Sequence, residues 1–216
     1  MKIFFDVDGV LIAGWHAKPE RRRRWDATLK ADLGVDPDAL QEKFFATPAG
    51  EFASLMHACV AGRLDLKEAL AGVLPSLGYS GPVDAFVAYW LEKDSNLNLE
   101  ILEIVKRLAR CPGVELYVVT GQEHYRAGYL WNTLGFRDHF KDILYSARFG
   151  HLKGTAAFFA SIDAMLGIGA GEAPLFFDDQ EEVVSLARDA GWDAYVFEDL
   201  STILTHPRLQ TLLAAP

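Results

Sequence analysis

The sequence has little that would support a disulfide framework, a zinc site or a membrane span. It contains two cysteines, Cys59 and Cys111, which form no CxxC pair, and its six histidines form no cluster at metal-finger spacing. No apolar stretch approaches the roughly 20 residues that a membrane helix requires. Asp6 interrupts the first apolar residues before a secretory segment can form. We therefore expect a soluble, unprocessed protein of the reducing cytoplasm.

Basic residues are also in short supply. The chain has 21 lysines and arginines against 30 acidic residues, a formal net charge of −9. This balance opposes counterion-driven binding to a phosphate backbone, so we do not expect nucleic acid as a partner. The lack of a long apolar stretch leads us to expect no membrane partner either. With 216 residues, 50% hydrophobic and 24% charged, the composition favours one globular domain, or one domain carrying an insert.

Short apolar runs that end at a polar residue or a turn predict buried strands. Four are clear and residues 143–146 form a weaker fifth; the clear ones are residues 2–6 (KIFFD), 114–120 (VELYVVT), 174–178 (PLFFD) and 194–197 (AYVF). Helical patterns closed by glycine cover residues 123–134, 154–166 and 181–190. This alternation predicts an α/β fold with a doubly wound parallel sheet.

More than ninety residues separate the first strand from the next, whereas a plain crossover is far shorter. The interval contains amphipathic helical patterns at residues 22–33, 38–45, 51–61, 66–77 and 83–91, divided by turn signals. We therefore expect residues 14–96 to form a helical insert over the carboxyl edge of the sheet, and residues 1–13 and 97–216 to form the core.

The carboxyl ends of parallel strands are where ligands bind in such a sheet. This sequence places chemically useful groups at four such positions, namely Asp6-Val7-Asp8-Gly9, Thr120-Gly121, Lys153 and Asp178-Asp179. Acidic residues from separate strands can hold Mg²⁺, which takes oxygen ligands. A carboxylate that attacks an anionic phosphate needs such a metal and donors for the phosphoryl oxygens.

Taken in order, the segments FFDVDGVL, YVVTG, HLK and FFDDQEEV resemble the four motifs of the haloacid dehalogenase-like (HAD) hydrolase superfamily. The resemblance spans residues 2–197. The helical insert matches the placement of the cap domain in the subgroup whose cap follows the first strand. The resemblance implies a Rossmann-like catalytic core with an α-helical cap.

The resemblance also implies a role for each matching residue. Asp6 is expected to attack phosphorus and form an aspartyl-phosphate, and Asp8 to protonate the leaving oxygen and later deprotonate water. Thr120 and the Gly121 amide are expected to bind the phosphoryl oxygens, while Lys153 neutralises the nucleophile and the phosphate.

The Mg²⁺ ligands that the resemblance implies are Asp6, Asp8 through its backbone carbonyl, Asp178 and Asp179. Asp179 occupies the more constant acidic position of the fourth motif, and which of the last two binds the metal directly is left open. Gln122 departs from the usual asparagine or glycine after the threonine.

Two other positions also depart from the usual motifs. Gly154 stands where many members of the superfamily have a proline after the lysine. Glu182 stands where many of them have an asparagine or an aspartate.

The resulting prediction is a magnesium-dependent phosphatase of a small phosphorylated metabolite, as monomer or homodimer. A phosphomutase of the same superfamily and a non-catalytic phosphate-binding protein are the alternatives. Asp8 argues against a dehalogenase, which typically lacks an aspartate there. Response-regulator receivers also combine acids, threonine and lysine, but they have no large insert after the first strand.

Residues of the insert that could contact the substrate are also open to a structural interpretation. The basic cluster of Lys18 and Arg21–Arg24 could steer an anionic substrate, although a solvated helical turn is the favoured interpretation. Most of the aromatic and histidine candidates are expected to be core residues of the insert; they are Trp15, His16, Phe44, Phe45, Phe52 and His57.

Overall fold

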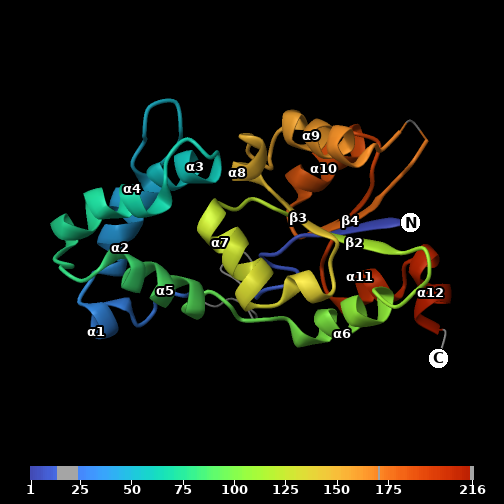
Figure 1. The fold of residues 1–216 in the computed structure, drawn as a ribbon, viewed down its shortest axis with the longest axis horizontal. Coiled ribbons are helices and arrows are strands. Elements are labelled where there is room, and N and C mark those ends of the chain that lie inside the picture. Colours follow the sequence, from blue (N-terminus) through green and yellow to red (C-terminus); the bar gives the residue numbers. More distant parts are fainter. Residues whose placement is uncertain (14–23, 170, 215–216) are drawn as a thin grey trace.

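Five parallel β-strands form one sheet in the order β3-β2-β1-β4-β5; helices flank it on the right-hand side of Figure 1. The computed structural model describes residues 1–13, 24–169 and 171–214. Every neighbouring pair of strands is parallel, which confirms the predicted α/β class with a doubly wound sheet. The strands are β1 (Lys2–Phe5), β2 (Glu115–Thr120), β3 (Asp142–Tyr145), β4 (Leu175–Asp178) and β5 (Asp193–Val196).

Helices cover the sheet on both faces. They are α6 (Leu99–Leu108), α7 (His124–Gly128), α8 (Ser146–Phe149), α9 (Ala156–Leu166), α10 (Glu181–Asp189), α11 (Leu200–Leu204) and α12 (Pro207–Ala214). Ile3 and Phe5 share one buried cluster with side chains of α6, α11 and α12. Phe4 points to the other face and packs with side chains of α9 and α10. Side chains that alternate along β1 thus pack into two hydrophobic layers, which is why residues 3–5 of the strand are all apolar.

The predicted helix at residues 123–134 is more irregular than its pattern indicates. An α-helical turn, α7, runs into a π-helical turn, η4 (Tyr129–Thr133), and a 3₁₀ turn, η5 (Phe136–Asp138), follows. Gly135 lies between the last two with φ of 75°, a left-handed conformation that glycine adopts without steric cost.

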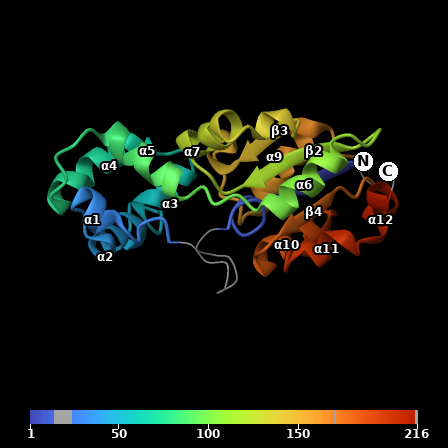
Figure 2. The same ribbon diagram turned by 90° about the horizontal axis from the view of Figure 1, so that it is seen from below.

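A second group of helices, called here the helical unit, lies beside the core (Figures 1 and 2). It consists of α1 (Leu29–Leu33), α2 (Pro37–Leu40), η2 (Gln41–Ala46), α3 (Leu55–Val60), α4 (Leu66–Val73), η3 (Leu74–Leu77) and α5 (Val83–Lys93). The unit has its own hydrophobic cluster, which includes Phe44, Leu70, Phe86 and Trp90.

Two helices of this unit begin later than their patterns predict. In the described part of the predicted helix at residues 22–33, α1 begins only at Leu29. The Arg24 side chain pairs with Asp26, two residues away, and residues at this spacing do not face each other on a helix. The α3 helix begins at Leu55 because Ser54 caps it by accepting a hydrogen bond from the His57 N–H at 3.1 Å.

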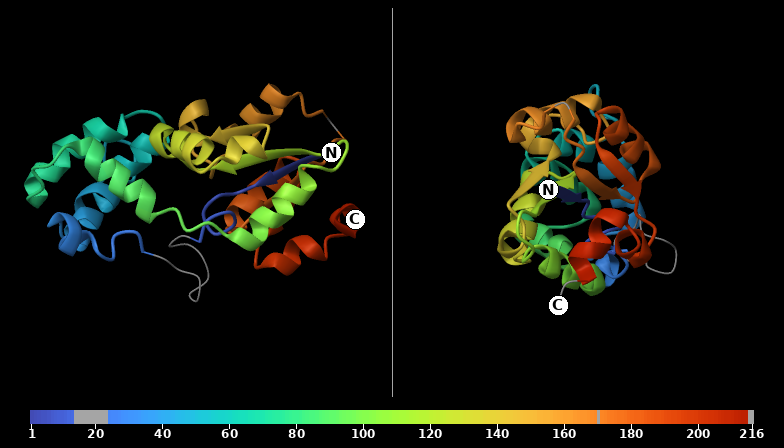
Figure 3. Two further views of the ribbon diagram at one scale, coloured as in Figure 1. Left: turned by 60° about the horizontal axis from the view of Figure 1, so that its bottom comes forward. Right: turned by 90° about the vertical axis from the view of Figure 1, so that its right-hand side faces the viewer.

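The helical unit lies toward the carboxyl ends of the strands. The chain enters β1 on the side away from α1–α5, so the parallel strands run toward them (Figure 3). The Tyr125 hydroxyl donates to Asp65 of the helical unit at 2.8 Å. At Gly62 the backbone passes so close to α8 that a Cβ would lie 2.7 Å from the Ala147 carbonyl oxygen. In the described residues, no helix is long and apolar enough to cross a membrane.

Removing a fully buried ring from the helical unit should destabilise it. Phe86→Ala deletes a side chain with no exposed surface, so we expect the free energy of unfolding to fall by about 3–5 kcal/mol. The matched control is Leu64→Ala, at a side chain that is 41% exposed, which should change it by less than about 1 kcal/mol. Urea unfolding followed by circular dichroism measures both, and equal losses would contradict the assignment of this core.

Candidate active site

The end of β1 is a tight turn that brings two carboxylates to the edge of the sheet. Asp6 is 2% exposed, and its N–H donates to the Phe177 carbonyl at 3.0 Å. Gly9 follows with φ of 89°, and a Cβ there would lie 2.0 Å from Oδ2 of Asp179. Glycine is therefore required at position 9 for two reasons: the backbone has a left-handed conformation, and the Asp179 side chain lies too close for a Cβ.

Lys153 bridges two of the acidic residues that the sequence placed in separate motifs. Its Nζ lies 2.6 Å from Oδ1 of Asp6 and 2.5 Å from Oδ2 of Asp178. The Lys153 N–H donates to the buried Ser146 hydroxyl at 2.9 Å, which fixes the loop that carries the side chain. The motifs after β1, β3 and β4 therefore meet at one buried ion-pair network.

Three carboxylates of this network lie close enough to share one cation. An oxygen of Asp6, one of Asp178 and one of Asp179 all lie within 4.8 Å of one another. Burial and the neighbouring carboxylate of Asp178 raise the pKa of Asp6 well above its usual value. Burial, again with Asp178, raises the pKa of Asp179 to about 7. Burial is the largest cause of both shifts, and the repulsion from Asp178 adds to it against the opposing charge of Lys153.

Besides Oδ2 of Asp178, which forms the ion pair with Lys153, two buried oxygens at this edge lack a hydrogen-bond partner within the described part of the chain. They are the hydroxyl Oγ1 of Thr120 and Oδ1 of Asp179. Buried polar atoms are rarely left unpaired, and such exceptions often mark positions completed by an ion, water or ligand. The Thr120 hydroxyl can donate a hydrogen bond to an anion, whereas the Asp179 oxygen can coordinate a cation.

Asp8 lies apart from the three-carboxylate group and is held by the segment after β2. Oδ2 of Asp8 accepts from the Gln122 amide at 2.6 Å, and Oδ1 accepts from the Arg126 guanidinium at 2.7 Å. Gln122, whose departure from the usual motif was noted from the sequence, thus contacts a candidate catalytic carboxylate directly.

Arg126 and Asp94 are site residues that the sequence analysis missed. Arg126 Nη1 lies 2.7 Å from Oδ2 of Asp94, and both side chains are mostly buried. Burial raises the pKa of Asp94 to about 6, although the positive charge of Arg126 opposes the shift. Neither residue belongs to a strand-end motif, so no local pattern singles them out.

A cavity of about 510 Å³ opens between the helical unit and Asp8. Gly121, Gln122 and Arg126 line it from the core, and aromatic, polar and charged side chains line it from the helical unit. The latter are Arg24, Trp25, Asp26, Asp38, Gln41, Phe45, Ser54, Met56, His57, Trp90 and Asp94. Its size is within the range of small-molecule sites.

The candidates that the sequence offered for this pocket divide into three groups. Phe45 and His57 line the cavity, whereas Phe44 is fully buried in the hydrophobic cluster and Phe52 does not line it. Trp15, His16, Lys18 and Arg21–Arg23 lie outside the described residues. Glu182, which departs from the usual fourth motif, is exposed.

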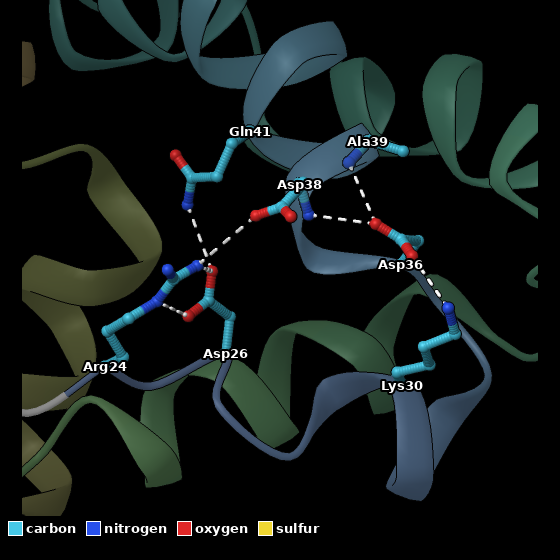
Figure 4. A network of polar contacts seen from close by, with 7 residues as sticks. All are labelled: Arg24, Asp26, Lys30, Asp36, Asp38, Ala39 and Gln41. Atoms are coloured by element: carbon cyan, nitrogen blue, oxygen red, sulfur yellow. Dashed lines mark hydrogen bonds and ion pairs between the residues drawn. The ribbon is translucent and has the colours of Figure 1, made fainter.

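Arg24 is the described member of the basic cluster, and it is tied to a buried acid. Its Nε and Nη2 donate to the two oxygens of Asp26 at 2.8 and 2.9 Å, and Gln41 donates to Oδ2 of Asp26 at 3.2 Å (Figure 4). Asp26 is 2% exposed. Arg24 borders the cavity, and its side chain remains 40% exposed, in agreement with the solvated position that the sequence favoured. It lies before α1, however, and not in a helical turn.

No protein-family model matches the sequence, and no curated protein matches it significantly. The fold, however, is similar to those of solved HAD enzymes. A HAD family enzyme from Bacteroides thetaiotaomicron, in complex with magnesium and inorganic phosphate, superposes with a TM-score of 0.71 at 18% identity, over 93% of this chain and 97% of that one.

Two further structures show the same arrangement. A HAD-like family hydrolase from Porphyromonas gingivalis has a TM-score of 0.71 at 18% identity, over 100% of this chain and 98% of the other. L-2-haloacid dehalogenase from Xanthobacter autotrophicus has a TM-score of 0.57 at 18% identity, over 100% and 84%. The chain therefore has the fold of HAD-like hydrolases, as the four motifs predicted.

The raised pKa of Asp179 predicts a stabilising effect of Asp179→Asn in the presence of a chelator. Folding raises this pKa from 3.8 to about 7, so the folded state holds the proton more tightly and stability falls as pH rises between these values. The neutral amide removes this loss. We expect the free energy of unfolding at pH 8 to rise by about 1–2 kcal/mol, and the gain to shrink toward pH 4.

Chemical denaturation of both proteins across this pH range measures the difference. The exposed acid Asp138, whose side chain is 70% accessible, provides the control variant Asp138→Asn, which should show no such trend. A variant at Asp179 that is less stable than the parent at pH 8 would contradict the charge imbalance.

Proposed function

We propose that this protein is a magnesium-dependent phosphatase that hydrolyses a small phosphomonoester through an aspartyl-phosphate on Asp6. The observation that carries the proposal is the joint placement of Asp6, Asp178, Asp179, Lys153 and the unpaired Thr120 hydroxyl at one edge of the sheet. The magnesium and phosphate bound to the Bacteroides enzyme of the same fold support it.

The donor set fits a hard divalent cation. Asp6, Asp178 and Asp179 offer three carboxylates with oxygens within 4.8 Å of one another. The pKa values of Asp6 and Asp179 are raised, and an additional cation bound there would lower them again. We expect these residues to hold Mg²⁺ together with the backbone carbonyl of Asp8. When bound, the metal would neutralise the charge that builds up between the nucleophile and the phosphate.

The phosphoryl group would be held by donors that the site already presents. The Thr120 hydroxyl is buried and unpaired among the described residues, and Gly121, which borders both Lys153 and the cavity, offers a backbone N–H. The Lys153 ammonium adds a fixed positive charge 2.6 Å from Asp6. Such pre-positioned donors stabilise charge that develops on the transferring oxygens.

The first chemical step forms a bond between a carboxylate oxygen of Asp6 and phosphorus, and it breaks the bond from phosphorus to the ester oxygen. Lys153 holds Oδ1 of Asp6, so the nucleophile is oriented before the substrate arrives. The leaving oxygen takes a proton from Asp8. The second step reverses these roles: water attacks phosphorus and gives its proton to Asp8, and free phosphate leaves Asp6.

The position of Asp8 suits this proton transfer. It borders the cavity, where the leaving group must lie, and it stands outside the three-carboxylate group. The helical unit covers this cavity, so we infer that it acts as a cap that admits small esters and excludes bulk water during the reaction.

Loss of the nucleophile should abolish phosphate release. Against a panel of sugar phosphates, phosphoglycolate and nucleoside monophosphates, we expect the parent to turn over at least one ester with Mg²⁺ and none with EDTA. Asp6→Asn should lower kcat by more than about 10³-fold because no covalent intermediate can form. Asp8→Asn should lower it about 10²–10⁴-fold because the leaving oxygen is no longer protonated.

The exposed Asp138→Asn variant is the control and should retain the parent rate. Phosphate release that persists in EDTA, or in Asp6→Asn, would contradict the proposal. Transfer of the phosphoryl group between positions of a sugar, without release to water, would instead identify a phosphomutase.

A further inference from the structure

Arg126 joins two carboxylates that come from different parts of the molecule. Its Nη2 donates to Oδ1 of Asp8 at 2.7 Å and to the Asp94 carbonyl at 3.3 Å, and its Nη1 lies 2.7 Å from the Asp94 carboxylate. The planar guanidinium has the fork that such double contact requires, whereas an ammonium is a point charge.

Arg126 itself is anchored to the core. It lies in the first turn of α7, where the buried Glu123 carboxylate accepts the N–H of Tyr125 and the N–H of Arg126, both at 2.6 Å. Glu123 is the third residue after the end of β2 at Thr120, so the guanidinium is held close to the carboxyl end of the sheet.

Asp94, in contrast, belongs to the helical unit. It ends α5, and its N–H donates to the Trp90 carbonyl at 2.9 Å. The chain then returns to the core beside the segment that leaves it, with the Ala13 N–H donating to Asn96 and the Asn98 N–H to Leu11, both at 2.8 Å. A rotation of the helical unit about this paired linker would move Asp94 relative to α7.

The two oxygens of Asp8 therefore depend on different parts of the molecule. Oδ2 is held by Gln122, a core residue. Oδ1 is held by Arg126, whose buried charge is shared with Asp94. When Asp94 moves away, Arg126 loses one of its two carboxylate partners, and a mostly buried guanidinium must then reposition or solvate.

We propose that Arg126 is a positioning residue that couples the orientation of Asp8 to the placement of the helical unit, with Asp94 as the point of attachment. The coupling rests on the proposed phosphatase activity. It makes proton transfer to the leaving group efficient only in the arrangement in which the helical unit covers the cavity.

The experiment compares an alkyl and an aryl phosphomonoester, the first chosen from the panel and the second p-nitrophenyl phosphate. A phenolate leaves readily without a proton, whereas an alkoxide needs the proton from Asp8. Asp94→Asn and Arg126→Lys keep the size and much of the polarity of each side chain. Because both esters pass through the same aspartyl-phosphate, the quantity to compare is kcat/KM, which reports the step in which the leaving group departs. We expect both variants to lower kcat/KM on the alkyl ester by about 10–100-fold and on the aryl ester by less than about 3-fold.

The double variant tests whether the two residues act through one contact. We expect its loss on the alkyl ester to equal that of the more impaired single variant, because coupled residues are not additive. Arg148→Lys alters a separate ion pair, with Asp142 at 2.8 Å, and should leave both rates unchanged.

The contradicting outcomes are distinct. Equal losses on both esters, or losses that multiply in the double variant, would overturn the coupling while leaving the phosphatase intact. A parent protein that hydrolyses neither ester with Mg²⁺ would overturn the proposed function and the coupling with it.

Discussion

The arrangement of the site depends on one imbalance of charge. Lys153 is shared by Asp6 and Asp178, with Asp179 beside them, so among the described residues three clustered carboxylates face one ammonium group. Burying such an excess is costly unless a further cation balances it. The carboxylates lie together because the parallel strands end at the same edge of the sheet. Their burial and mutual repulsion raise the pKa of Asp6 and of Asp179. A bound dication would restore the balance.

The helical unit adds a second constraint, because it connects to the core where the chemistry is expected. Its chain leaves after β1 and returns before α6, and the two linkers pair with each other near Asp8. The Arg126 contacts place an ion pair across this junction. The position of the helices and the environment of the expected acid and base are therefore parts of one structure, rather than two independent features.

Much of this could be predicted from local sequence. Each strand was expected to within one residue because short, largely apolar runs ending in polar residues are distinctive. The acids at the ends of β1 and β4 follow directly from that pattern. What could not be predicted depends on tertiary contacts. Arg126 sits one turn into a helix, and Asp94 ends a helix more than thirty residues earlier in the chain. The late start of α1 also involves a longer-range contact, because Asp26, which pairs with Arg24, accepts a hydrogen bond from Gln41 of η2.

The most direct test of this account is mass spectrometry of the protein quenched in acid during turnover of an alkyl phosphomonoester. The account predicts a phosphoryl adduct on the peptide that contains Asp6, formed only with Mg²⁺ and absent from Asp6→Asn. Turnover without any adduct, or with the adduct on another residue, would contradict the assignment of Asp6 as the nucleophile.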